Sequence, residues 1–259
     1  MNIIVCMKRV PDTSLVGRVT IDSSGLDIEK KLLGFKINEW DEYALEEAVQ
    51  ICKRLGGTIT AVTVGTNECD DLLRKALALG ANQAVRVDED LTLSDSAAVA
   101  QVLGALVSKT PHDLVLFGMQ SEDFGAADLG VMVAETLGIS HAAGIVKVEG
   151  GNGELKVWRE VEGGAQEIYS IKLPAVLTIQ TGINHPRYPS FLNIRKAKDK
   201  ELHVITLAEL GLDKTGISKL VTLQNLEFPR VTKHGEILSG SSEETAAQLS
   251  TILNELGVP

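Results

Sequence analysis

The sequence predicts an α/β fold, a doubly wound and mainly parallel sheet with an antiparallel hairpin insertion and an extended C-terminal arm. Apolar segments of strand length alternate with helical segments up to residue 137, and a helix between two strands gives a right-handed, parallel crossover. Short alternating segments separated by glycines follow, which is typical of hairpins. From Thr181 onward, apolar residues no longer recur at the spacing of a helix or a strand. We therefore assign residues 1–181 to the α/β domain and residues 182–259 to the arm.

The first half of the chain contains four expected strands, each followed by a helix. The strands are expected at 2–7, 58–64, 84–87 and 113–117, and the helices at 38–56, 67–79, 94–108 and 123–137. Many residues of the second strand are β-branched, Asn38 is a typical N-cap residue, and Gly56 and Gly80 are typical helix ends. After the first strand we expect a loop at 8–12 and a weak hairpin at 18–29.

The second half has a different pattern. Antiparallel strands are expected at 142–149, 154–162 and 167–171, joined by turns at 150–153 and 163–164, and a strand at 175–179 is expected to rejoin the main sheet. The stretch 182–241 is too long for a connector in a compact domain, and wrapping a partner is one use for such a segment. It contains a basic run at 195–200 and precedes a last helix at 243–256.

Composition excludes several classes of function. A net charge of −10 argues against a nucleic-acid binder, because phosphate backbones require concentrated lysine and arginine. Cys6, Cys52 and Cys69 lack metal-ligand spacing, so we expect buried thiols in a reducing compartment and no metal. The apolar runs are too short to span a bilayer. We expect a soluble, cytoplasmic protein without direct membrane insertion.

The chain lacks the common catalytic and nucleotide motifs. It has no Gly-x-Gly-x-x-Gly after a strand, no Walker loop and no Gly-x-Ser-x-Gly elbow, and its five histidines are scattered. The pairs Glu46–Glu47 and Glu243–Glu244 are interpreted as solvated helix faces, and Asp41 and Asp123 as helix caps. We predict no catalytic residues and favour a binding protein over an enzyme.

The segment 113–130 is the most informative part of the chain. A buried-type strand leads into Gly118, a polar loop and an expected helix start with Gly125, Ala126 and Ala127. Such small residues let a ligand approach the backbone, where free N–H groups and the helix dipole favour a phosphate. The alternative is that they serve only for close packing.

Four segments together resemble one known family. They are VCMKRVPD at 5–12, INEWDEYALE at 37–46, GMQSEDFGAADLG at 118–130 and GINHPRYPSFLNIRKAK at 182–198. In order and spacing these resemble the β subunit of electron-transfer flavoproteins, over nearly the whole chain. The resemblance implies an adenine-nucleotide-hydrolase-like fold and an α subunit that holds the redox-active FAD. The implied partners are an acyl-CoA-type or related dehydrogenase and a quinone oxidoreductase or other acceptor.

The resemblance also implies a nucleotide site in this chain. Carried over by position, its residues are Cys6, Asn38, Glu39, Trp40, Asp41, Val64, Gly118, Gln120, Asp123, Gly125, Ala126, Ala127, Asp128 and Leu129. Most family members bind AMP there, whereas electron-bifurcating members bind a second FAD that accepts hydride from NADH. Glu39 replaces the family's usual proline, and Asp128 adds negative charge near the expected phosphate. We expect AMP, with a second FAD as the alternative.

The fourth segment resembles the family's recognition loop, at 184–200 here. The implied partner-binding residues are Pro186, Arg187, Tyr188, Phe191, Leu192 and Lys196. Phe191 would be an apolar anchor for a pocket of the dehydrogenase, unless it fills a local core. A rival to the electron carrier is a stand-alone adenine-nucleotide-binding protein of the universal-stress type, which would have little use for the arm.

Overall fold

The computed structural model describes residues 1–14, 18–92, 94–151, 153–230 and 235–257. The chain divides into two compact units, Met1–Asn225 and Leu226–Pro259. The second unit contains α7 (Ser242–Glu255), which begins with a capping box between Ser241 and Glu244. Among the described residues, no helix combines the length and the apolar character needed to cross a membrane.

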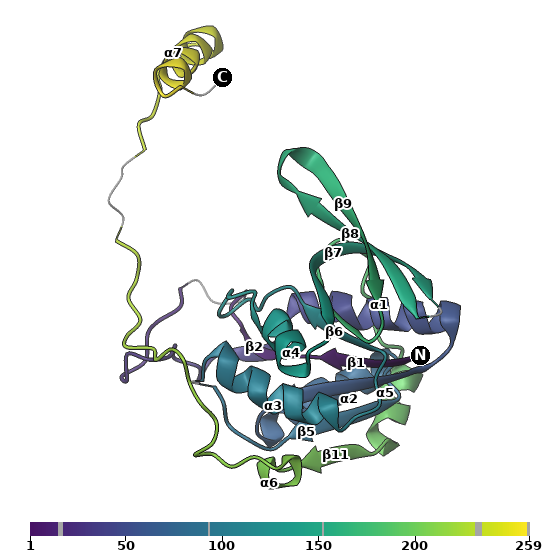
Figure 1. The fold of residues 1–259 in the computed structure, drawn as a ribbon. Helices are drawn as coiled ribbons and strands as arrows, with labels where there is room; N and C mark the ends of the chain where they lie inside the picture. Colours follow the sequence, from purple (N-terminus) through teal and green to yellow (C-terminus); the bar gives the residue numbers. More distant parts are fainter. Residues whose placement is uncertain (15–17, 93, 152, 231–234, 258–259) are drawn as a thin grey trace. The chain divides into compact units, whose positions relative to one another are not determined.

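The first unit is built on a sheet that contains nine of the described strands (Figure 1). In spatial order they are β11 (Leu202–Ile205), β5 (Gln83–Val87), β4 (Thr58–Val64), β1 (Asn2–Cys6), β6 (Leu114–Gly118), β10 (Ala175–Ile179), β7 (Ser140–Gly151), β8 (Glu154–Val161) and β9 (Ala165–Lys172). All neighbours from β11 to β7 pair in parallel, and β7, β8 and β9 pair antiparallel. The predicted hairpins and the return of β10 to the main sheet are confirmed. Asn152, in the expected turn, lies outside the described residues.

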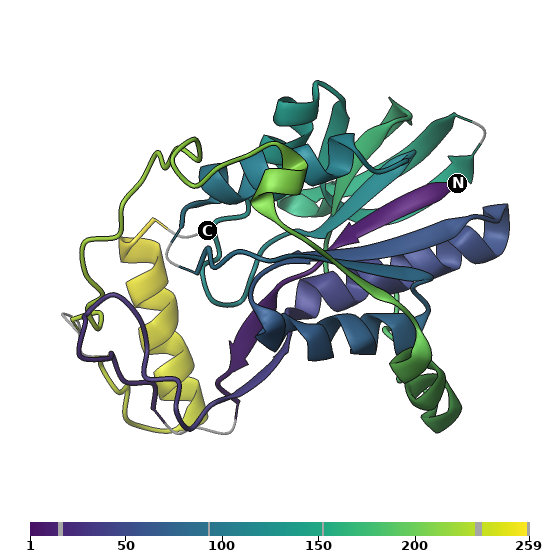
Figure 2. The same cartoon turned by 90° about the horizontal axis from the view of Figure 1, so that it is seen from below.

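Helices cover both faces of the parallel region (Figure 2). One core joins the sheet to α1 (Glu39–Leu55), α2 (Asp70–Leu79) and α5 (Phe191–Asp199), and the other joins it to α3 (Ser96–Ser108), α4 (Leu129–Leu137) and α6 (Leu207–Leu210). Strand β1 supplies Ile3 and Val5 to the first core and Ile4 and Cys6 to the second. Since successive strand residues face opposite sides, this alternation confirms the doubly wound fold. Short 3-10 turns occupy Asn67–Cys69 and Glu162–Gly164.

The prediction of a loop at residues 8–12 is wrong. Strand β2 (Arg9–Asp12) pairs antiparallel with β3 (Gly34–Ile37) as a separate two-stranded ribbon. Val10 is buried, and Pro11 is tolerated because a two-stranded ribbon has edges that need no N–H donor. The weak hairpin at 18–29 is reduced to one antiparallel bridge, between Ile21 and Ile28.

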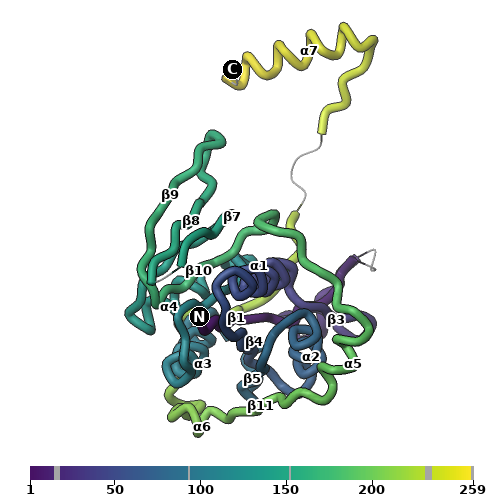
Figure 3. Tube along the Cα trace, turned by 90° about the vertical axis from the view of Figure 1, so that its right-hand side faces the viewer, coloured from purple at the N-terminus to yellow at the C-terminus, as the bar shows by residue number. Residues whose placement is uncertain are grey.

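The first unit extends well past residue 181, where the sequence placed a domain boundary. Helix α5 packs beside α2, and β11 adds a parallel strand next to β5 (Figure 3). Both elements lie in the stretch expected to be an irregular arm. The local sequence pattern is too short to predict β11, which has only four residues. This strand is stabilised by its pairing with β5.

Candidate functional site

The candidate site lies at the carboxyl ends of β1 and β6. From β1 the chain proceeds to β4 and β5 on one side, and β6 then lies on the other side of β1. The strand order therefore reverses between β1 and β6, which is where open α/β sheets bind ligands. Cys6, Val64 and Gly118 end three neighbouring strands at this edge.

Asp41 joins the two loops of this crevice. Its buried carboxylate accepts hydrogen bonds from the Lys8 N–H at 2.7 Å and the Gly118 N–H at 3.0 Å. The interpretation of Asp41 as a simple helix cap is therefore wrong. Both acceptor oxygens serve backbone groups outside α1, because the first turn of α1 lies against the ends of β1 and β6.

Asn38 connects the same helix to the 118–129 loop. It occupies the N-cap position of α1 as expected, but its side chain caps no helix N–H group. Its amide donates to the Gln120 carbonyl at 2.8 Å and its oxygen accepts from the Glu122 N–H at 3.0 Å. The Asn38 side chain therefore holds the 118–129 loop against the start of α1, and both its amide nitrogen and its oxygen form hydrogen bonds with the loop.

Charged residues complete this support. Glu122 accepts from the Glu39 N–H at 3.0 Å and pairs with Lys36 at 2.9 Å. Lys8 pairs with Asp123 at 2.7 Å, and its ammonium lies 4.5 Å from the Phe124 ring centroid. The capping interpretation of Asp123 is replaced by this ion pair. Lys8 and Glu122 were not among the predicted site residues, although both lie in segments that carried the family resemblance.

The three small residues at 125–127, just before α4, do not serve close packing. Gly125, Ala126 and Ala127 are exposed, and a Cβ atom on Gly125 would meet nothing within 4 Å. Helix α4 begins at Leu129, so the helix start expected at 123 is wrong. Gly125 (φ 62°) and Ala127 (φ 57°) adopt the left-handed conformation, which alanine rarely adopts. The close-packing alternative is thereby excluded for these three positions.

The end of this loop presents donors and one unpaired acceptor. Among the described hydrogen bonds, none uses the N–H groups of Ala126, Ala127, Asp128 or Leu129. Within the same described part of the chain, the buried Asp128 Oδ1 has no hydrogen-bond partner. Free amides at a helix start fit an anion, and a buried acceptor without a donor fits a ligand hydroxyl or amino group. Together they fit a nucleotide that has both a phosphate and a sugar or base.

Burial raises the pKa of Asp41 to about 7, because desolvation outweighs the hydrogen bonds from Lys8, Asn38 and Gly118. The thiol of Cys6 has a raised pKa, first through its burial and then through the charge of Asp41. Cys6 is therefore a neutral thiol in the wall of the crevice. Cys52 and Cys69 are also free thiols with pKa values raised by burial.

We expect Asp41 to make stability depend on pH. Its folded-state pKa lies above the unfolded value of 3.8, so the folded chain binds the proton more tightly. The contribution is complete below pH 3.8 and is lost as pH rises to about 7, with a total on the order of a few kcal/mol. Denaturant unfolding of wild type and Asp41→Asn across this range should show the loss only in wild type. Parallel curves for the two proteins would contradict the assignment.

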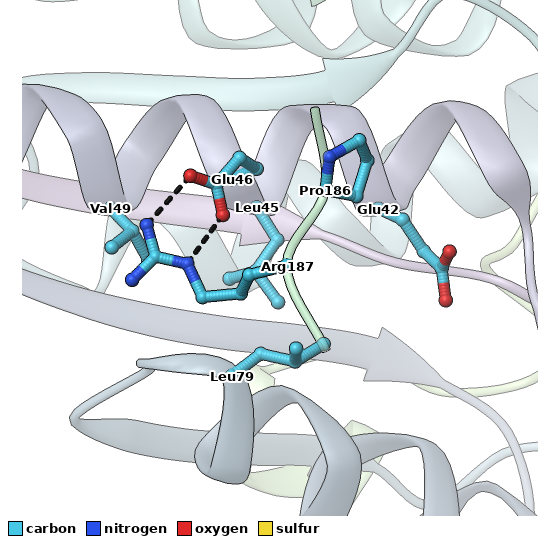
Figure 4. A pocket seen from close by; sticks show the side chains of 7 residues that line it. All are labelled: Glu42, Leu45, Glu46, Val49, Leu79, Pro186 and Arg187. Atoms are coloured by element: carbon cyan, nitrogen blue, oxygen red, sulfur yellow. Dashed lines mark hydrogen bonds and ion pairs between the residues drawn. The ribbon is translucent and has the colours of Figure 1, made fainter. Parts of the chain in front are cut away.

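The segment that resembles a recognition loop begins as a loop and continues as helix α5. Tyr188, Phe191 and Leu192 are exposed, with 81% of Phe191 accessible, so Phe191 fills no core within this chain. The hydroxyl of Ser190 accepts from the Asn193 N–H at 3.2 Å and caps α5. Lys196 is exposed on this helix, whereas the guanidinium of Arg187 binds Glu46 (Figure 4).

Glu46 and Glu47 are both buried, so the expectation of a solvated helix face is wrong for this pair. They face residues of the 180–187 stretch, which the sequence treated as part of the arm. Glu243 and Glu244 are exposed on α7 as expected. Among the described residues, no group of three or more His, Cys, Asp or Glu side chains is placed to hold a metal ion.

Comparison with known proteins assigns a family to this arrangement. The electron transfer flavoprotein domain family matches residues 28–210. The electron transfer flavoprotein subunit beta of Bacillus subtilis is 38% identical over 256 residues, which cover 98% of this chain and 97% of the relative. The proteins of the same name from Methylophilus methylotrophus (35% identical; 98% of each chain) and Homo sapiens (34% identical; 99% of this chain, 98% of the relative) are similar over nearly their whole length. The chain therefore belongs to the electron transfer flavoprotein β-subunit family.

Proposed function

We propose that this chain is an electron-carrier subunit that forms a heterodimer with an FAD-bearing α subunit. Family membership over nearly the whole length supports this role. FAD held mainly by the α subunit would supply the redox chemistry, and the β chain would orient it and bind partners. The three free cysteines favour a reducing compartment, so we propose a cytoplasmic location.

We propose AMP as the nucleotide in the β1/β6 crevice. The observation that carries this assignment is the combination of unused N–H groups at 126–129 with the unpaired Asp128 Oδ1. The N–H groups would hold the phosphate, and the carboxylate oxygen would accept from a ribose hydroxyl or the adenine amino group. Cys6 and Val64 would border the adenine, and Asn38 and Asp41 would hold the loops that form the site.

Asp128 raises an electrostatic question for a phosphate ligand. A carboxylate disfavours a nearby anion, and the ammonium groups of Lys8 and Lys36 do not offset it, because they are paired to Asp123 and Glu122. The favourable potential for a phosphate comes from the free amides and the positive end of α4. A hydroxyl bound to Asp128 also removes the cost of an unpaired buried acceptor. The residues present therefore fit an adenine nucleotide.

We further propose that the exposed apolar residues at the start of α5 dock the donor dehydrogenase. Prolines at 186 and 189 stiffen the approach to Phe191, so little conformational entropy is lost on binding. Phe191 and Leu192 would enter an apolar pocket of the partner. Lys196 would add positive charge at the rim and increase the association rate with an acidic surface.

Nucleotide analysis of the purified heterodimer tests this function. We expect one FAD and one AMP per heterodimer after denaturation, because the α subunit would hold the FAD and the described residues of this chain form the β1/β6 crevice for AMP. Two FAD per heterodimer would instead indicate the electron-bifurcating type, in which this chain holds a second FAD. A monomer that carries ATP and binds no flavoprotein partner would contradict the carrier role and support the stress-type alternative.

A further inference from the structure

Two buried carboxylates on α1 require an explanation. Glu46 is 6% exposed and Glu47 is 3% exposed. Burying a carboxylate is costly unless it is paired or hydrogen-bonded. The partners of these two side chains therefore indicate what their positions are used for.

Their closest partners come from one stretch of chain, residues 180–187. Arg187 donates two hydrogen bonds to the Glu46 carboxylate, both at 2.6 Å (Figure 4). The Asn184 amide donates to Glu47 Oε2 and to the Tyr43 carbonyl, each at 3.1 Å. Burial acts to raise the pKa of Glu46, but the hydrogen bonds from Arg187 and Gln50 and the charge of Arg187 outweigh it, and the net shift is downward.

A third contact continues this series toward the start of α1. Trp40 donates from Nε1 to Gln180 Oε1 at 3.0 Å. From Trp40 the α1 contacts continue at Tyr43 and then at Glu46 and Glu47, in steps of three or four residues, so they form one stripe along the helix. The 180–187 stretch therefore runs along α1 and is bound to it about once in each helical turn.

These contacts end just before the exposed apolar residues. We define the docking segment as residues 184–192, which includes the exposed Tyr188, Phe191 and Leu192. Arg187 is its last side chain bound to α1 and lies four positions before Phe191. At the far end of α5, the Arg74 guanidinium donates to the Ala197 carbonyl at 2.9 Å. The exposed Phe191 therefore lies between two segments that are bound to the rest of the fold, one at Arg187 and one at Ala197.

We propose that Arg187 is a positioning residue, whose pairing with Glu46 fixes the docking segment on α1, rather than a residue that contacts the partner. This inference rests on the proposed docking function. The bidentate geometry suits a positioning role because both guanidinium contacts restrict direction as well as distance. Since α1 also begins in the nucleotide crevice, one helix supports both proposed binding regions.

The test is steady-state kinetics of the purified heterodimer with an acyl-CoA dehydrogenase that reduces the wild type. Glu46→Gln and Arg187→Lys should each raise the KM for the heterodimer about tenfold, a change of ~1.4 kcal/mol, with kcat and nucleotide content unchanged. The double variant should be little worse than either single variant, because both remove the same pair. Hydrogen exchange within residues 184–192 should become faster in each.

Two further variants separate positioning from partner contact and from misfolding. Exchanging the charges, Glu46→Arg with Arg187→Glu, should recover part of the lost affinity. Glu46→Leu with Arg187→Met removes the whole ion pair and leaves no unpaired charge, so it should keep the fold while the KM stays raised. Glu42→Gln is the matched control, because Glu42 lies one turn earlier on α1 and pairs with Lys75 instead, at 2.6 Å. It should leave the KM unchanged.

The outcomes distinguish this inference from the function on which it rests. An effect of Arg187→Lys without any effect of Glu46→Gln would indicate direct partner contact and overturn the positioning role. An unchanged KM in both variants, with a raised KM in Phe191→Ala, would overturn the inference and leave docking intact. An unchanged KM in Phe191→Ala would remove the docking assignment itself.

Discussion

Replacing Phe191 with alanine is expected to raise the KM of the donor dehydrogenase for the heterodimer by roughly 30-fold to several hundredfold. Buried aromatic anchors at interface centres contribute about 2–4 kcal/mol, and each 1.4 kcal/mol is tenfold in affinity. Phe191 is 81% exposed in this chain, so its truncation should not lower the stability of the fold. Dehydrogenase kinetics, together with FAD and AMP content, would measure both effects.

Leu220→Ala is the matched control for this substitution. Leu220 is another large apolar residue with an exposed side chain, at 76%, but it lies outside the docking segment. It should have little effect on the KM. Equal effects of the two substitutions would show that exposed apolar area in general, rather than the start of α5, determines docking.

Substituting Gly118 with alanine is expected to empty the nucleotide crevice. A Cβ atom at this position would lie 2.5 Å from Asp41 Oδ1 and 2.5 Å from Trp40 Cβ. The start of α1 would have to move, which breaks the Asp41 hydrogen bond to the Gly118 N–H and costs about 1–3 kcal/mol of folding stability. AMP per purified heterodimer should fall toward zero, and the unfolding midpoint should decrease.

Gly34→Ala provides a control in the neighbouring ribbon. A Cβ atom on Gly34 would approach only Asp12 Cβ, at 3.9 Å, which is an ordinary contact. This variant should retain its nucleotide and its stability. Full AMP content in Gly118→Ala would show that the close approach of α1 to β6 is not needed for binding.

Elements with a strong local pattern were predictable, whereas some of the shortest strands were not. The sequence placed β4 at 58–64, and the structure has the same bounds, because seven mostly β-branched residues give a clear signal. Strands β2 and β11 have four residues each and were missed. Such strands depend on their partners β3 and β5, which lie far from them in the sequence.

The candidate site was predicted in location but not in detail. The strand ends at Cys6, Val64 and Gly118 follow from the order of strands and helices. The role of Asp41 does not follow, because an acidic residue at a helix start is normally interpreted as a cap. The sequence pattern could not predict that residues 125–127 are exposed, because small residues are compatible both with close packing and with the approach of a ligand.

The sequence by itself determined the fold class, the family and the residues near the strand ends, since local periodicity encodes which face of each element is buried. Only the tertiary structure decided how the polar side chains are used. Asp41 binds a backbone group 77 positions away, and Glu46 pairs with Arg187 across 141 positions. Glu46 and Glu47 looked solvated because a charged side chain is usually exposed. They are buried because the folded chain places Arg187 and Asn184 against them. A local sequence pattern cannot predict partners that are so distant along the chain.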